Sequence, residues 1–93
     1  MALPFTFSGV PKFAKVVSLD VANIVTVTSA DQTFTVTGLT TDMYIVAFCP
    51  TLTADVSFCN VHCSAKDTLK IRFRNFTGGD INPAAMDWYI IGL

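Results

Sequence analysis

The sequence contains no glutamate, and all seven of its acidic residues are aspartates. Because glutamate favours helices and aspartate favours turns, this bias is typical of a chain with many turns and few helices. No segment shows a sustained helical period, and none reaches the roughly 18 consecutive apolar residues that a membrane-spanning helix needs. The opening residues lack a basic stretch before a long apolar run, so we expect no secretory signal, no membrane partner and synthesis in the cytoplasm.

Charge is also scarce, since charged residues make up 14% of the 93 residues and the net charge is −1. A dedicated nucleic-acid binder needs a positive field, so we expect no nucleic-acid partner. Hydrophobic residues make up 52% of the chain, although a chain of this length buries only about 60–65% of its unfolded surface. The excess indicates either a dense core or apolar surface that is buried against other subunits.

The clearest local pattern is a period of two over residues 69–74. One face carries the apolar side chains Leu69, Ile71 and Phe73. The other face carries the basic side chains Lys70, Arg72 and Arg74. This alternation predicts a half-buried antiparallel strand. The basic stripe is either a solvated strand face or a contact with an acidic protein surface. Nucleic acid is the weakest alternative, because a domain with negative net charge attracts it little.

Similar short patterns, separated by turn residues, recur along the chain. We expect strands at residues 15–19, 21–28, 33–37, 43–49, 56–63, 67–76 and 88–93, with turns that include residues 29–32 and 38–42. This succession predicts an all-β fold, a small antiparallel β-sandwich of immunoglobulin-like or jelly-roll type. Residues 43–49 and 88–93 are apolar on both faces, so they need a cover from the N-terminal segment, the long turns or another subunit.

Residues 1–14 differ from the rest because they combine prolines with phenylalanines. Pro4 and Pro11 discourage strand pairing, whereas Phe5, Phe7 and Phe13 favour burial. The segment is either a frayed terminus or edge strand, or an extended arm that lies across a neighbouring subunit. We therefore divide the chain into an N-terminal arm, residues 1–14, and a β-sandwich domain, residues 15–93.

The three cysteines and the single histidine form the one group that suggests a metal. Cys59, His62 and Cys63 lie close in sequence, with Cys49 upstream. In a regular strand, Cys59 and Cys63 would share one face and His62 would point to the other, so they could not converge on one zinc ion. We expect no metal site and no cofactor. With a single histidine and aspartates mostly in turns, we also expect no enzyme.

Four segments, in this order, resemble a group of short β-rich structural proteins of tailed bacteriophages. They are residues 35–42, 50–54, 64–77 and 81–84, within a region of about two thirds of the chain from residue 33 to residue 93. The cysteine–histidine group and the heavier basic stripe depart from the family's pattern, and the arm is not covered by the resemblance. The motifs are turn and strand chemistry, so they say little about mechanism.

The resemblance implies a virion protein similar to capsid decoration, or cement, proteins. Its partners would be the major capsid protein and itself, as a homotrimer on the capsid exterior. The alternative is a fibre, spike or baseplate module for host recognition. We expect capsid or neighbour contacts from Phe5, Phe7, Phe13, Lys70, Arg72 and Arg74. We expect subunit packing from the aromatic residues Tyr44, Phe48, Trp88 and Tyr89, since aromatic anchors dominate many interfaces.

The arm hypothesis generates a first prediction. Replacing Phe5 and Phe7 by Ala should leave the sandwich folded but lower the occupancy of the protein on capsid shells, because the arm would lose its apolar anchors. A pull-down of shells with each protein measures this occupancy. Unchanged occupancy would contradict the arm as a contact.

Overall fold

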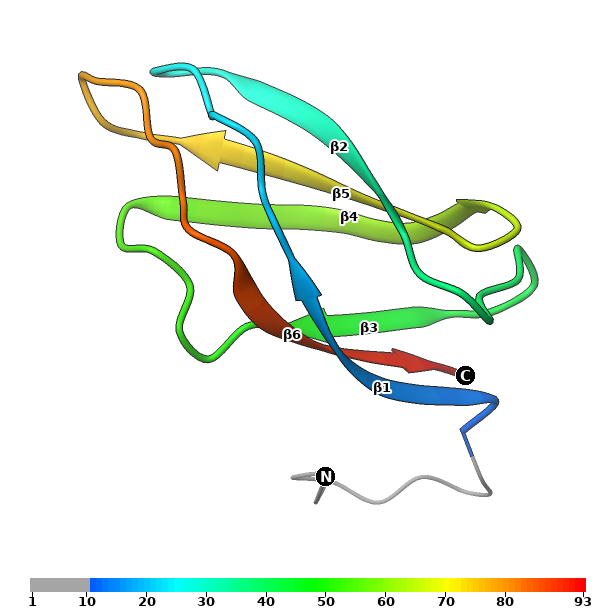
Figure 1. Ribbon diagram of the computed structural model, residues 1–93. Coiled ribbons are helices and arrows are strands. Elements are labelled where there is room, and N and C mark those ends of the chain that lie inside the picture. The colour runs from blue at the N-terminus through cyan, green and yellow to red at the C-terminus, as the bar shows by residue number, and fades with distance from the viewer. Residues whose placement is uncertain (1–10) are drawn as a thin grey trace.

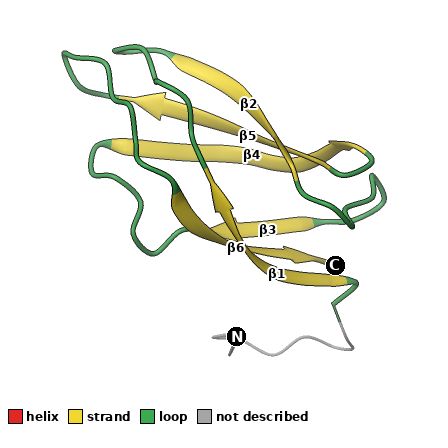
Figure 2. Cartoon of the chain, viewed as in Figure 1, coloured by secondary structure: helices red, strands yellow, loops and turns green. Residues whose placement is uncertain are grey.

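The structure is a computed structural model of the chain and describes residues 11–93. These residues form six β-strands and no α-helix (Figure 1, Figure 2). The strands are β1 (Phe13–Leu19), β2 (Ser29–Thr35), β3 (Ile45–Phe48), β4 (Val56–Ala65), β5 (Thr68–Asn75) and β6 (Met86–Gly92). The all-β prediction is confirmed. No helix within the described part of the chain has the length and apolar character to cross a membrane.

The strands form two antiparallel sheets of three strands each. One sheet has the order β1-β6-β3 and the other has the order β2-β5-β4. Figure 1 shows them as two layers, with the hairpin of β4 and β5 in one layer and the C-terminal strand β6 at the centre of the other. The small antiparallel sandwich that the sequence predicts is therefore confirmed.

The inward-facing side chains of the two sheets form one core. Leu69, Ile71 and Phe73 of β5 are fully buried, as their alternation predicts. From β6, the Trp88 ring lies edge-on to Phe58 at 4.9 Å and to Phe73 at 5.9 Å between ring centroids. Each such aromatic pair adds about 0.5–1.5 kcal/mol to the hydrophobic contribution of burial. Trp88 therefore joins the two sheets.

Two segments differ from the expected secondary structure, one just before β2 and one in its first half. Residues 21–28, expected as a strand, form only a bridge from Ile24 to Ile81, with N–H···O distances of 2.7 and 3.0 Å. The expected turn at residues 29–32 is instead the first half of β2, paired with β5. The reason is that the chain turns earlier, at Val27, whose φ of 53° is incompatible with an extended strand.

Phe13 belongs to the sandwich rather than to an arm. It is the first residue of β1 and packs, half-buried, against the core. A Cβ atom on Gly38 would lie 3.0 Å from its ring, and a Cβ atom on Gly92 would lie 3.1 Å from its Cβ, so both glycines leave room for it. The expected boundary at residue 14 therefore shifts toward the N-terminus. Phe5 and Phe7 lie outside the described residues.

One buried polar side chain, Asn75, organises the end of the sandwich. Its Nδ2 donates to the carbonyl oxygens of Ile24, at 3.0 Å, and Gly79, at 2.8 Å. Its Oδ1 accepts from the backbone N–H and the hydroxyl of Thr77, at 2.8 and 2.7 Å. The fully buried amide thus has partners for both its nitrogen and its oxygen, as burial requires. Asn75 ties the connection before β2 to the connection after β5.

Replacing Asn75 by Ala should lower the free energy of unfolding by about 3 kcal/mol, because the carbonyls of Ile24 and Gly79 would lose their donor in a buried site. For a domain of this size, this loss predicts a fall in Tm of roughly 10–20 °C. Thermal denaturation followed by circular dichroism measures it. Asn82→Ala, at an exposed loop position, is the matched control. Equal melting temperatures for the two variants would show that the Asn75 network does not support the fold.

Candidate functional site

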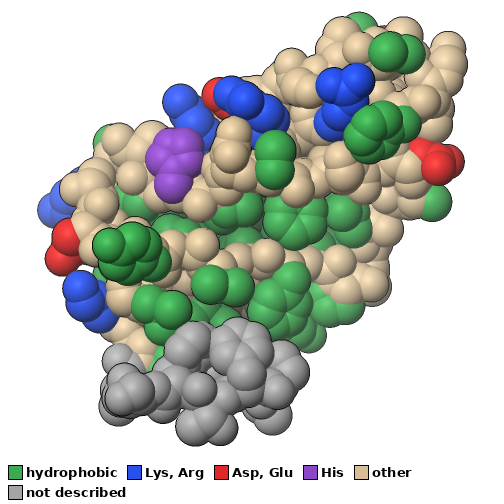
Figure 3. Space-filling view, turned by 180° about the vertical axis from the view of Figure 1, so that it is seen from behind, with side chains coloured by type: hydrophobic (Ala, Val, Ile, Leu, Met, Phe, Trp, Pro, Cys, Tyr) green, Lys and Arg blue, Asp and Glu red, His purple; other side chains and the backbone are tan. Residues whose placement is uncertain are grey.

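The two sheets turn faces of opposite character away from the core. Outward residues of the β2-β5-β4 sheet form the basic face: Ser29, Asp31, Thr33, Ser57, Cys59, His62, Lys70, Arg72 and Arg74. Outward residues of the β1-β6-β3 sheet form the apolar face: Val16, Tyr44, Val46, Phe48 and Tyr89. Ile91 faces the same way but is fully buried. In Figure 3, the His side chain and several Lys and Arg side chains lie along the upper part of the view, others lie at its left edge, and hydrophobic side chains occupy the middle.

The three cations of β5 lie in the middle of the basic face. Each one has a neighbour on β2 and another on β4. These neighbours are Thr33 and His62 for Lys70, Asp31 and Cys59 for Arg72, and Ser29 and Ser57 for Arg74. The outward position that the sequence predicts for all three cations is confirmed.

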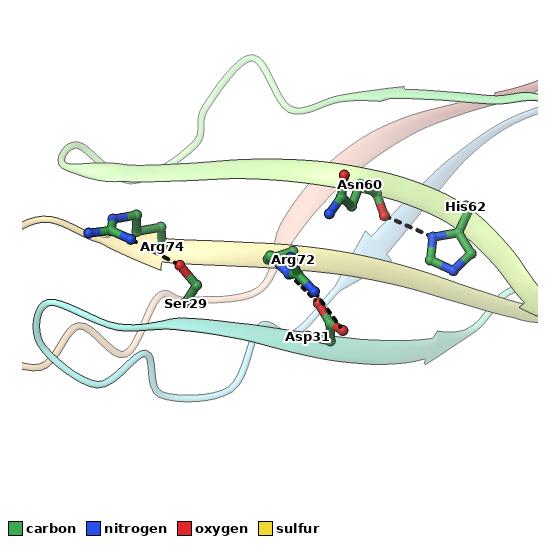
Figure 4. A network of polar contacts seen from close by, with 6 residues as sticks. All are labelled: Ser29, Asp31, Asn60, His62, Arg72 and Arg74. Carbon is green, nitrogen blue, oxygen red and sulfur yellow. Dashed lines mark hydrogen bonds and ion pairs between the residues drawn. The ribbon is translucent and has the colours of Figure 1, made fainter.

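The central cation is paired, which the sequence analysis missed. Arg72 donates from Nε to Asp31 Oδ1 at 2.8 Å and from Nη2 to Oδ2 at 3.4 Å (Figure 4). This hydrogen bonding from Arg72, together with the positive charges of Arg72 and Lys70, lowers the pKa of Asp31. The same contact raises the pKa of Arg72. No local sequence pattern could reveal this pair, because Asp31 lies 41 residues from Arg72 in a segment that we expected to be a turn. The two residues meet only through the pairing of β2 with β5.

The remaining positive charge of the face lies on either side of this pair. Arg74 donates to Ser29 Oγ at 3.3 Å, and its guanidinium lies 5.0 Å from the centroid of the Phe76 ring. Within residues 11–93, neither Arg74 nor Lys70 forms an ion pair. The face therefore offers two cations to an acidic partner, separated by a neutralised pair.

A β-bulge in β4 changes the expected arrangement of the cysteine–histidine group. The pairing with β5 shifts between Cys59 and His62, and Asn60 has a left-handed φ of 52°. The extra residue puts Cys59 and His62 on the same outer face, whereas Cys63 points into the core. The expectation that Cys59 and Cys63 share a face is therefore wrong. His62 Nδ1 lies 2.9 Å from the carbonyl oxygen of Asn60 (Figure 4).

The three cysteines are free thiols in separate surroundings. Cys49 and Cys63 are buried, and Cys59 is exposed. The thiol of Cys63 donates to the carbonyl oxygen of Ala65 at 2.8 Å. Across the described range, 11–93, no three His, Cys or Asp side chains come together as a metal site.

The apolar face brings together three of the four aromatic residues that were predicted to pack against other subunits. Tyr44 is 80% exposed, and Phe48 and Tyr89 form an edge-to-face pair at 5.2 Å. Val16, on β1, is 50% exposed on the same face. Trp88 is different: it points inward and is fully buried, so it packs within its own domain rather than against a neighbour.

A pocket of about 370 Å³ opens beside the apolar face. We call it the pocket, and it is lined by Pro50, Thr51, Ala85, Met86, Asp87 and Tyr89. Pro50, Ala85 and Met86 contribute aliphatic groups, whereas Thr51, Asp87 and Tyr89 contribute two hydroxyls and a carboxylate, so the lining is about equally polar and apolar. It offers apolar contact and one negative charge to a ligand. Sequence reasoning missed the pocket because its two walls, around residues 50 and 86, meet only in the folded chain.

The Asp31–Arg72 pair predicts a specific effect of pH. The folded-state pKa of Asp31 lies below its ordinary value of about 3.9, so the pair stabilises the fold above about pH 4. This contribution disappears as the pH falls through the lower folded-state value. In Arg72→Gln, the pKa of Asp31, read from its carboxyl chemical shift, should rise toward the ordinary value. The loss of stability at neutral pH should be small, because both side chains are exposed.

Lys66→Gln is the matched control for this titration, since it removes an exposed cation outside the pair and should leave the Asp31 pKa unchanged. If Arg72→Gln also leaves it unchanged, the ion pair does not form in solution.

Comparison with known proteins adds no relative to this description. The chain matches no family model, no curated protein and no solved structure. The two outer faces, the pocket and the resemblance seen in the sequence are therefore the features that bear on function.

Proposed function

We propose that this chain is a virion structural protein that decorates an icosahedral phage capsid from outside and stabilises it as a homotrimer. The apolar face is the observation that carries the proposal. Tyr44 and Val16 leave 80% and 50% of their side chains exposed there. Large exposed apolar areas mark interaction surfaces in proteins that remain in solution. A protein that assembles in many copies on one capsid lattice can bury such a surface against its neighbours.

In this proposal the apolar face packs against neighbouring copies. The edge-to-face pair of Phe48 and Tyr89 fixes two aromatic rings in place before association. Preorganised aromatic side chains lose little conformational freedom on binding, which favours them as interface anchors. Tyr44 extends the same surface along β3.

The basic face contacts the major capsid protein. At this contact Lys70 carries a positive charge that no aspartate of the described residues neutralises, so the complementary surface on the shell is acidic. Charged groups at such contacts guide association and orientation more than they add affinity. This role also agrees with a chain whose overall charge is −1, since three of its six cations lie side by side on one face.

The mechanism of stabilisation is thermodynamic. A protein that binds the assembled shell and not its free subunits stabilises the shell by mass action. A trimer contacts several capsid subunits at once, and linked contacts raise the total affinity far above that of one contact. Opening the shell then requires breaking many such contacts.

The basic face gives the test of this function. Purified protein is added to shells of the encoding phage that lack it, and bound protein is measured after co-sedimentation. Lys70→Glu should weaken binding by about fivefold per contact, because it replaces an attraction with a repulsion at the shell surface. Binding of the unmodified chain should also weaken as salt is added.

Lys66→Glu is the control, with the same charge change in the turn between β4 and β5, and it should bind like the unmodified chain. No uptake by shells at any salt concentration would overturn the proposal. Imaging of intact virions with labelled protein gives an independent answer, because label confined to the tail would favour the fibre, spike or baseplate alternative.

A further inference from the structure

Three hydrophobic side chains stand exposed at one end of the sandwich. We call them the tip: Val25, Val27 and Phe76, which are 52%, 63% and 62% exposed. They are three of the five large hydrophobic side chains that are exposed in residues 11–93. They come from the connection between β1 and β2 and the connection after β5, which lie together in the upper left of Figure 1.

The tip is held in place by hydrogen bonds. The backbone N–H of Thr26 donates to Asp80 Oδ1 at 3.0 Å, and its hydroxyl donates to the carbonyl oxygen of Thr77. The Asn75 side chain holds Ile24, just before the tip, from inside. Both connections are therefore braced, and the exposed side chains are presented in a defined arrangement.

Val27 is poorly suited to this position on conformational grounds. Its φ of 53° lies in the left-handed region, where a β-branched side chain is strained. Asparagine adopts this conformation more readily and would suit an exposed position. Strain combined with exposure of an apolar side chain is a feature of binding sites rather than of folding.

A positively charged side chain, Arg74, lies beside the tip. The guanidinium of Arg74 lies 5.0 Å from the Phe76 ring centroid, so the aromatic ring and the cation form one unit. A matching surface would need a hollow with aliphatic side chains for the ring and a carboxylate for the guanidinium.

The pocket of this same chain has that chemistry. It has a volume of about 370 Å³, an aliphatic wall from Pro50, Ala85 and Met86, and the exposed carboxylate of Asp87. Within the described residues, Asp87 forms no ion pair. The connection from β5 to β6 carries Phe76 of the tip at its start and Ala85 of the pocket at its end.

We propose that the tip of one copy inserts into the pocket of a second copy, with Phe76 in the hollow and Arg74 paired with Asp87. Because the two surfaces differ, each copy uses its tip on one neighbour and its pocket on another. Such a contact closes into a ring when the rotation between copies allows it. The inference deepens the self-association in the proposed function and rests on that part of it.

Charge exchange tests the contact in the full chain by sedimentation velocity over a range of concentrations. Arg74→Asp alone and Asp87→Arg alone should each weaken self-association by at least about tenfold, because each puts like charges together. The double variant restores an opposite pair and should return to within about threefold of the unmodified chain. Lys66→Asp and Asp20→Arg, which make the same charge changes at other exposed positions, should have no effect.

Val27→Asn provides a second variant that cannot fail by misfolding, since it should raise Tm by relieving strain. It should nevertheless weaken self-association, because the tip loses an apolar contact. Monomeric unmodified protein at all concentrations would overturn the inference, as would single variants that associate normally or a double variant that does not recover. Retention of a monomeric chain on anionic lipid vesicles would also overturn it.

Shell uptake is measured separately, so the two proposals can fail independently. If the chain associates but the Arg74 and Asp87 variants associate equally well, the tip–pocket contact is wrong while decoration of shells stands. If the charge exchange succeeds but shells take up no protein, the contact stands and the decorating function is wrong.

Discussion

The constraint behind this structure is that two three-stranded sheets can shield only one face each. The inner faces meet around Trp88, which is fully enclosed together with Phe73. Both outer faces are left without a helix to cover them in the described part of the chain. On one sheet this is harmless because the outer face is polar, as is usual in antiparallel sheets. On the other sheet the outer face is apolar, and this asymmetry favours association through that face.

The charge distribution follows the same division. Successive side chains of a strand point to opposite faces of the sheet. Because Leu69, Ile71 and Phe73 of β5 point inward, the three cations between and after them point outward. Asp31, brought across from β2, neutralises the middle of the row. The result is two separated positive groups rather than a continuous basic patch. Such a surface suits an acidic protein partner better than the closely spaced phosphates of nucleic acid.

The sequence was most informative where a strand is regular. The alternation from Leu69 to Arg74 predicted both the buried and the exposed side of β5, because a period of two is a local property. It failed at the bulge near Asn60, where one extra residue moved Cys59 to the other face. Local patterns also could not reveal the pocket, the Asp31–Arg72 pair or the Asn75 network. Each depends on at least one contact between residues far apart in the sequence, such as Asp31 with Arg72, 41 positions apart, and Ile24 with Asn75, 51 positions apart.

Asn75 connects folding to the candidate interaction surfaces. Its amide holds Ile24 on one side and the chain from Thr77 to Gly79 on the other, so it fixes the loops that carry the tip. The segment that leaves this network continues to Ala85 and Met86, which form a wall of the pocket. Phe76 of the tip and one wall of the pocket are therefore carried by one continuous stretch with a buried polar anchor at its start. An apolar side chain at position 75 could not impose this geometry, because carbonyl groups are oriented by hydrogen bonds and not by packing alone.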